Sequence, residues 1–262
     1  AMGEKYARLR PFIGVGFAYF LIGVVVPGLI LTLRGEEGRW TFRGAMLSLA
    51  AGALGAVGAL GIIFAFNFGG KPVFVMPLVF GGAPVVNAFL TIYWARKLGE
   101  IGPIFQAGLI MVVLGAVTVL INAPKKDAPA PEPAAAVAVE AQQQIGSPAT
   151  RFVLQLLSIG VVIACWGAYG PVLHKGQAAM QQSRFRPLLC VGLAYFAIAV
   201  IVPQLILVVH PEPSEWNISG TIWSLLAGAA GAIGALGIIM AFNFGGHPIY
   251  VMPLVFGGAP VV

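Results

Sequence analysis

Long apolar runs separated by short polar segments are the dominant pattern of this chain. An α-helix needs about 20 apolar residues to cross the hydrocarbon core of a bilayer. The runs predict eight membrane-spanning helices, at residues 11–33, 44–68, 72–95, 101–121, 152–173, 187–209, 218–243 and 247–262. Most of the polar segments between them are too short to fold by themselves. We therefore expect an all-α polytopic membrane protein.

The apolar pattern occurs twice in the chain. Residues 54–86 and 230–262 are identical at 27 of 33 positions, with an offset of 176 residues. The same offset holds without a gap back to Arg10 and Arg186. An internal repeat has to be recognised first because it determines the architecture. A membrane protein built from two related halves is typical of a transporter.

One polar segment is long enough to separate the halves. Residues 122–150 are rich in Pro, Ala and Gln and are predicted to be a flexible linker between a first repeat, 1–121, and a second, 151–262. The span at 152–173 has no counterpart in the first repeat, and the span at 101–121 has none in the second. We expect a five-span unit whose first copy lacks its opening span and whose second lacks its closing span, so that the chain is a fragment of ten spans. Because five is odd, the copies are expected to be two inverted five-helix repeats.

Composition supports a membrane protein and excludes other classes. The chain is 59% hydrophobic and 9% charged, whereas soluble domains are about 25% charged. The net charge is +6, but Lys and Arg lie in short loops and at helix ends, so nucleic-acid binding is not expected. The two cysteines lie in apolar runs without metal-ligand spacing, and no metal or cofactor is expected. No phosphate-binding loop, metalloprotease motif or nucleophile–base pair is present, so we do not expect an enzyme.

Glycine recurs at every third position of the second span and of its repeat. These glycines are Gly52, Gly55, Gly58 and Gly61, and then Gly228, Gly231, Gly234 and Gly237. Small residues let helix backbones approach closely in lipid. Two interpretations stay open: the glycines serve tight helix packing alone, or they also leave room for a solute in a cavity.

Amide side chains within the spans are candidates for contact with a solute, because a polar group in lipid is costly unless it is satisfied. Asn67 and Asn243 occupy equivalent positions and either face a shared site or cap helix ends. Gln204 stands where the first repeat has Gly28. It is a candidate for substrate selectivity, with a helix–helix hydrogen bond as the alternative.

Three aromatic residues complete the candidate site. Tyr19 and Tyr195 are equivalent positions, and each offers an apolar body with one hydroxyl. Trp166 lies near the end of the span at 152–173, where it either lines the mouth of a cavity or anchors the helix at the membrane interface.

Several short motifs together resemble the EamA-like branch of the drug/metabolite transporter superfamily. The Trp-Gly-Ala-Tyr segment at 166–169, followed by Lys175, resembles the Trp-Gly motif that opens a repeat. Pro77 and Pro253 resemble the proline of the fourth span, and the Gly-Glu turn and glycines within 99–115 resemble the fifth span. The resemblance implies ten spans in two inverted five-span repeats, and transport of small metabolites by coupled or exchange mechanisms.

The sequence thus predicts a secondary transporter that moves a small metabolite by alternating access between its repeats. The alternative is a non-transporting membrane scaffold or sensor. The expected partners are a small-molecule solute and the lipid bilayer, with homodimerisation left open. The expected location is the cell membrane, plasma or inner, as a multi-pass protein.

Overall fold

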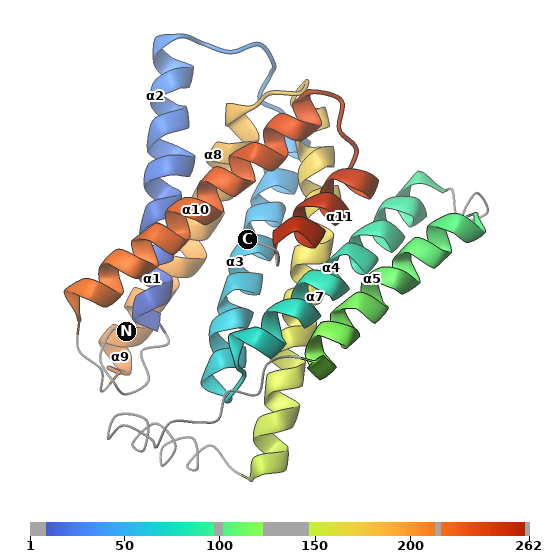
Figure 1. The fold of residues 1–262 in the computed structure, drawn as a ribbon. Helices are drawn as coiled ribbons and strands as arrows, with labels where there is room; N and C mark the ends of the chain where they lie inside the picture. Colours follow the sequence, from blue (N-terminus) through green and yellow to red (C-terminus); the bar gives the residue numbers. More distant parts are fainter. Residues whose placement is uncertain (1–8, 97–101, 123–146, 213–215, 260–262) are drawn as a thin grey trace.

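The computed structural model describes residues 9–96, 102–122, 147–212 and 216–259, and these residues form helices with no strand among them (Figure 1). In chain order the elements are α1 (Leu9–Phe20), η1 (Leu21–Val25), α2 (Val26–Leu33), α3 (Phe42–Asn67), α4 (Pro72–Ala95), α5 (Pro103–Asn122), α7 (Pro148–Ala179), α8 (Phe185–Phe196), η3 (Ala197–Ile201), α9 (Val202–Val209), α10 (Ile218–Asn243) and α11 (Pro248–Gly258). The predicted all-α class is confirmed for this part of the chain.

Six helical segments are long and apolar enough to cross a membrane. They are Leu9–Leu33, Phe42–Asn67, Pro72–Ala95, Pro148–Ala179, Phe185–Val209 and Ile218–Asn243. Two shorter apolar helical stretches are Pro103–Val112 and Pro248–Gly258. Six of the eight predicted spans are therefore confirmed as helices of sufficient length and hydrophobicity, which is consistent with a multi-pass membrane protein. Most of the predicted linker, residues 122–150, lies outside the described residues.

The equivalent spans Leu9–Leu33 and Phe185–Val209 each contain a π-helical turn in front of a proline. In the first half η1 precedes Pro27, and in the second η3 precedes Pro203. The N–H of Val26 donates to the carbonyl of Leu21, five residues back, and the same bond recurs in the second half. A proline has no N–H and its ring crowds the preceding turn. The wider π turn accommodates the ring, so the helix continues through each proline.

The repeated Asn-Phe-Gly-Gly segment is a tight connection between two helices. After α3 ends, Gly69 takes a left-handed φ of +97°, and its counterpart Gly245 takes +87°. The N–H of Gly70 donates to the carbonyl of Ala65 at 2.9 Å, which satisfies an orphan carbonyl of the helix end. A proline then opens the next helix at a position where no N–H is needed.

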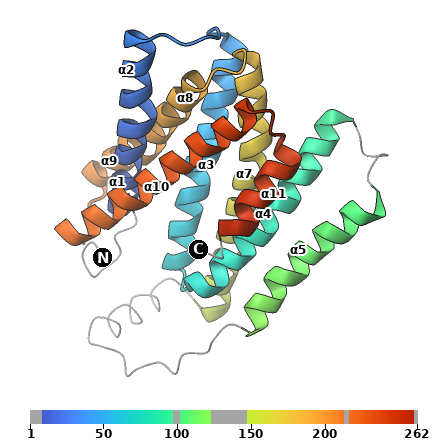
Figure 2. The same cartoon turned by 45° about the horizontal axis from the view of Figure 1, so that its top comes forward.

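The helices of one half pack against those of the other. Helix α1 lies against α10, and α8 lies against α3 (Figure 2). At these crossings an added Cβ at Gly52 would lie 2.7 Å from Cα of Val191, and one at Gly228 would lie 2.7 Å from Cα of Val15. Side chains at these glycines would collide with the neighbouring backbone, so the close crossings need glycine.

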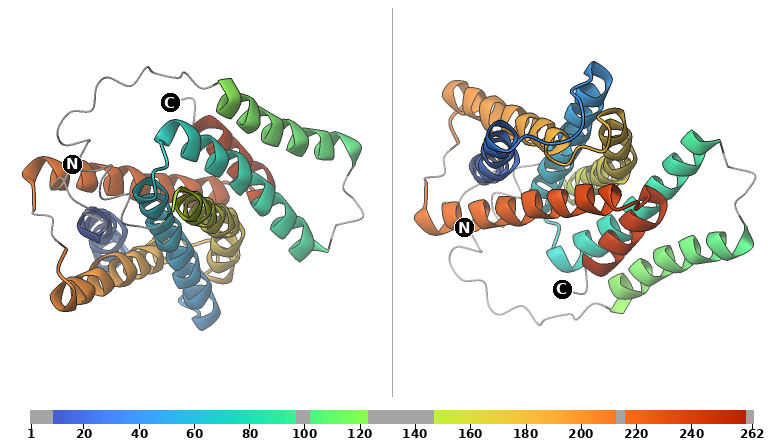
Figure 3. Two further views of the ribbon diagram at one scale, coloured as in Figure 1. Left: turned by 90° about the horizontal axis from the view of Figure 1, so that it is seen from below. Right: turned by 90° about the horizontal axis from the view of Figure 1, so that it is seen from above.

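Helix α7 lies in the middle of the bundle, against α3 and α4 (Figure 3). The main core includes fully buried side chains from α1, α7 and α10, namely Phe12, Leu173 and Phe242. Since these side chains come from both halves, a single core unites them.

Two acidic residues join the halves at equivalent positions. Glu36 follows α2 and accepts hydrogen bonds from the Arg184 backbone N–H at 2.6 Å and from the Arg186 guanidinium at 3.4 Å, at the start of α8. Its counterpart Glu212 follows α9 and accepts from the Leu9 N–H at 3.1 Å, at the start of α1. An acidic group at a helix N-terminus is favoured by the helix dipole and the free N–H groups. Each half thus caps a helix of the other, at α8 and at the equivalent α1.

Candidate functional site

A cavity of about 230 Å³ lies where the two halves meet. Its wall combines aromatic rings with glycine and small apolar residues. The lining residues are Tyr19, Gly55, Phe80, Trp166, Tyr169, Tyr195, Gly231, Gly234, Ala235, Ile238, Val255 and Phe256. Three pairs of them are related by the 176-residue offset, so both halves contribute equivalent positions to the wall.

Two stacked tyrosines form one wall of the cavity. The rings of Tyr19 and Tyr195 lie parallel within 2°, with centroids 3.6 Å apart. An added Cβ at Gly55 would lie 2.9 Å from the Tyr195 hydroxyl, and one at Gly231 would lie 2.9 Å from the Tyr19 hydroxyl. Direct face-to-face stacking is electrostatically unfavourable for two aromatic rings. The surrounding helices therefore impose this arrangement, and the glycines make room for the two hydroxyl ends.

Three further rings form a second aromatic wall. The centroids of Trp166, Phe80 and Phe256 lie 6.0 to 6.5 Å apart. The indole N–H of Trp166 donates to the carbonyl oxygen of Gly55 at 3.3 Å. The indole also covers Gly58, where an added Cβ would overlap its Nε1 and Cδ1 atoms. Trp166 is thus held by a helix that presents only backbone to it.

The described residues that line the cavity offer hydroxyl and backbone groups but no formal charge. None of its lining residues is acidic or basic. Tyr169 is 8% exposed, and its hydroxyl has no hydrogen-bond partner. A buried hydroxyl without a partner is costly and marks a place where a polar group fits. The described residues contain no group of three or more metal-ligating side chains. The geometry suits a small, uncharged, partly apolar molecule.

The structure brings together three of the six residues proposed from the sequence. Tyr19, Tyr195 and Trp166 all line the cavity. Sequence reasoning missed Tyr169, although it lies three residues after Trp166 and therefore on a similar face of the helix. It also missed Phe80 and Phe256. These two phenylalanines occupy equivalent positions of the repeat, and that equivalence was visible in the sequence.

The other three proposed residues lie away from this cavity. The side-chain N–H of Asn67 donates to the carbonyl of Ile63 in its own helix at 3.0 Å. The side chain of Asn243 donates to the carbonyl of Gln182 at 2.7 Å. Gln204 is exposed on α9. The two asparagines bond to backbone carbonyls in different places, one within its own helix and one in the segment after α7, and they do not line one cavity together.

Asn243 instead borders a polar cleft of about 490 Å³ between the loops after α2 and α7. Charged side chains line this cleft, among them Arg34, Glu36 and Arg184. The cleft lies near the end of the bundle where Glu36 caps α8, and it does not share lining residues with the aromatic cavity.

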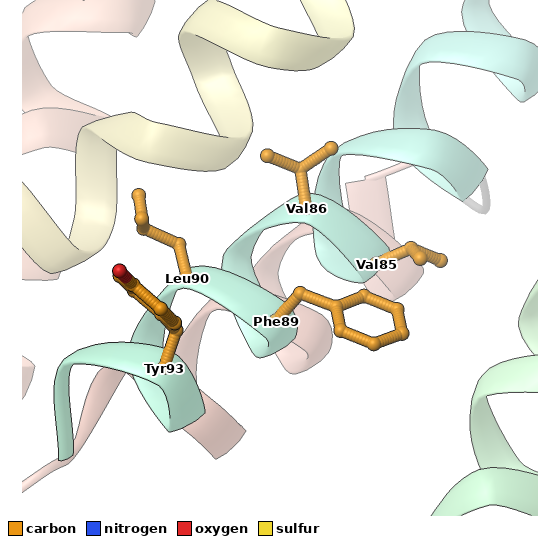
Figure 4. A pocket seen from close by; sticks show the side chains of 5 residues that line it. All are labelled: Val85, Val86, Phe89, Leu90 and Tyr93. Atoms are coloured by element: carbon orange, nitrogen blue, oxygen red, sulfur yellow. The ribbon is translucent and has the colours of Figure 1, made fainter. Parts of the chain in front are cut away.

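A third hollow, of about 460 Å³, runs along α4 (Figure 4). Its lining residues come from this one helix and are Val85, Val86, Phe89, Leu90 and Tyr93. An open apolar surface on one membrane helix fits lipid chains. It offers no converging polar groups, so the aromatic cavity remains the candidate site.

Comparisons of the chain with models of protein families, with curated proteins and with solved structures found no match.

Proposed function

We propose that this protein is a secondary transporter that moves a small metabolite by alternating access between two inverted five-helix repeats, as in EamA-like members of the drug/metabolite transporter superfamily. The observation that carries the proposal is the cavity between the halves. Its wall uses matched positions from both copies, including Tyr19 with Tyr195 and Phe80 with Phe256. In transporters built from repeats, substrate sites lie at the repeat interface.

The course of the helices supports inversion. In Figure 1, α3 runs down the page and α10 runs up it, so the equivalent turns that follow these helices lie at opposite ends of the bundle. The crossings of α1 with α10 and of α8 with α3 are equivalent under the offset. Exchanging the two halves therefore reproduces these two crossings, which supports inverted repeats.

The two acidic caps provide contacts that can open in turn. Glu36 fastens the first half to the start of α8, and Glu212 fastens the second half to the start of α1. A hydrogen bond to a charged group contributes about 1.5–3 kcal/mol. This is similar to the few kcal/mol that separate major and minor conformations of a protein. Releasing one cap while the other holds would open the cavity to one side only.

The small residues at the crossings support movement between the halves. Helices that meet through glycine present smooth surfaces without interdigitating side chains, as at Gly52 and Gly228. The π turns before Pro27 and Pro203 are places where hydrogen bonding changes at low cost.

A flux assay tests the proposal. The full-length protein in proteoliposomes is expected to show saturable uptake and counterflow of at least one member of a panel of small metabolites. Trp166→Ala is expected to raise KM or abolish flux, since it removes part of the cavity wall. Phe89→Ala, in the hollow along α4, is the matched control and should leave flux unchanged. Absence of saturable flux across the panel would contradict transport and favour a non-transporting scaffold or sensor.

A further inference from the structure

Two of the three histidines of the chain meet at one end of the bundle. His174 lies near the end of α7, and His247 is the residue that precedes α11. Their ring centroids lie 5.2 Å apart, with the ring planes inclined by 58°. The third histidine, His210, follows α9. The pair is defined by a contact between two described side chains and does not depend on an open helix face.

This spacing matches that of two imidazoles on one metal ion. A tetrahedral zinc ion binds imidazole nitrogens at about 2.0–2.1 Å, which places two such rings with centroids about 5 Å apart. We propose that His174 and His247 bind one divalent transition-metal ion of the zinc type, with water at the remaining positions. The ion joins α7 to the turn between α10 and α11.

Two buried amides hold together the helices that carry this pair. Asn87 of α4 donates to the carbonyl of Pro248, the first residue of α11, at 2.8 Å. Gln177 of α7 donates to the carbonyl of Ile239 in α10 at 3.1 Å. The segments on both sides of the pair are therefore fixed by hydrogen bonds of their own, which is the support that a metal site needs.

The oxygens of the same two amides have no donor. Asn87 and Gln177 are 0% exposed, and none of the described groups donates to Asn87 Oδ1 or Gln177 Oε1. A buried acceptor without a donor is costly. A metal-bound histidine donates its second ring N–H to a nearby oxygen. The amide oxygens are acceptors of this kind, for a ring N–H or for water on the ion.

The chemistry of the pair selects a transition metal. Imidazole suits zinc, copper and nickel, whereas Mg²⁺ and Ca²⁺ require oxygen ligands. The described residues contain no cluster of three or more His, Cys, Asp or Glu, so the protein supplies two ligands. Lys175, next to His174, has its ammonium 3.8 Å from the ring centroid of Trp94. That charge is thus engaged with α4.

The site belongs to one half of the repeat. The position equivalent to His247 is Lys71, and a lysine ammonium has no lone pair for a metal. Spacing along the chain does not predict the pair, because its members come from helices distant in sequence. The difference between the halves also supplies a mild variant. His247→Lys places in this turn the residue that the equivalent turn already carries.

Zinc titration of the full-length protein tests the inference. The protein is freed of its purification tag, placed in phosphatidylcholine nanodiscs and titrated by calorimetry. One Zn²⁺ is expected to bind saturably, and Mg²⁺ is not. His174→Ala and His247→Lys should each weaken Zn²⁺ binding at least about ten-fold, because one imidazole ligand is lost. His210→Ala is the matched control and should leave binding unchanged.

Absence of saturable Zn²⁺ binding, or equal binding by the unmodified protein and His247→Lys, would overturn the inference. X-ray absorption of the zinc-loaded protein should show two imidazole nitrogens at about 2.0–2.1 Å; sulfur ligands or a single imidazole would place the ion elsewhere and overturn it. Zinc should also raise the detergent-denaturation midpoint of the unmodified protein and not that of His247→Lys. These measurements do not involve flux, so their outcome is separate from that of the transport assay.

Discussion

The equivalent glycines Gly58 and Gly234 allow a stringent test, because the same substitution is expected to have opposite effects at the two positions. In α3, Gly58 is buried beneath the indole of Trp166, and an added Cβ would overlap that ring. In α10, Gly234 is exposed, and an added Cβ would meet none of the described residues within 4 Å. Sequence around the two positions is nearly the same, so a difference must come from tertiary packing.

The expected magnitudes follow from the contacts. Gly58→Ala forces the indole away from α3, with an overpacking cost of about 1–3 kcal/mol. The displaced indole also loses its hydrogen bond to Gly55, worth about 1 kcal/mol, while the gain in helix propensity is about 1 kcal/mol. The net loss in the free energy of unfolding is about 1–3 kcal/mol. Gly234→Ala makes no clash and is expected to be neutral or to stabilise by up to about 1 kcal/mol.

Unfolding in mixed micelles of a mild detergent and dodecyl sulfate, followed by far-UV circular dichroism, measures both variants. A double-mutant cycle gives the control: in a Trp166→Ala background, Gly58→Ala should lose most of its cost. A neutral Gly58→Ala would refute the packing of Trp166 on α3. An undiminished cost in the Trp166→Ala background would refute the indole as its cause.

Three other predictions concern topology, the acidic caps and the cavity. Lys71→Cys and His247→Cys, each in a background without the native cysteines, should react with a membrane-impermeant maleimide from opposite sides of the bilayer; labelling from one side would exclude inverted repeats. Glu36→Gln should lower the unfolding free energy by about 2 kcal/mol, because it leaves the Arg186 guanidinium without its ion pair; an unchanged detergent-denaturation midpoint would contradict the role of this cap. Tyr169→Phe removes a buried hydroxyl that has no partner among the described residues, so it should leave stability equal or higher; a clear loss of stability would show that the hydroxyl has a structural role.

Much of the helical layout was predictable from hydrophobicity. The predicted span at 72–95 coincides with α4 (Pro72–Ala95). The span predicted at 152–173 is longer in the structure, as α7 (Pro148–Ala179). The ends of this helix are polar, so a hydrophobicity criterion does not include them. Ser147 caps the helix by accepting a hydrogen bond from the Thr150 N–H. Helix length depends on caps as well as on the apolar run.

The candidate site was predictable only in part. Tyr19 and Tyr195 stood out in the sequence because they are equivalent polar-tipped residues, and both line the cavity. Asn67 stood out for the same reason, yet its amide bonds to its own helix. A polar residue in an apolar run has to be satisfied, but sequence does not tell whether a solute, another helix or the residue's own backbone satisfies it.

The sequence alone determined the helices, the repeat and the turns between paired helices, because these depend on local hydrophobicity and on glycine and proline at particular positions. Tertiary structure decided which glycines are covered and which are open. Gly58 and Gly234 lie in almost identical sequences, but within the residues that the structure describes only Gly58 lies under an indole, since Trp166 belongs to a helix distant in the chain. Cavities form from side chains that meet across helices, and that meeting depends on how the whole bundle packs.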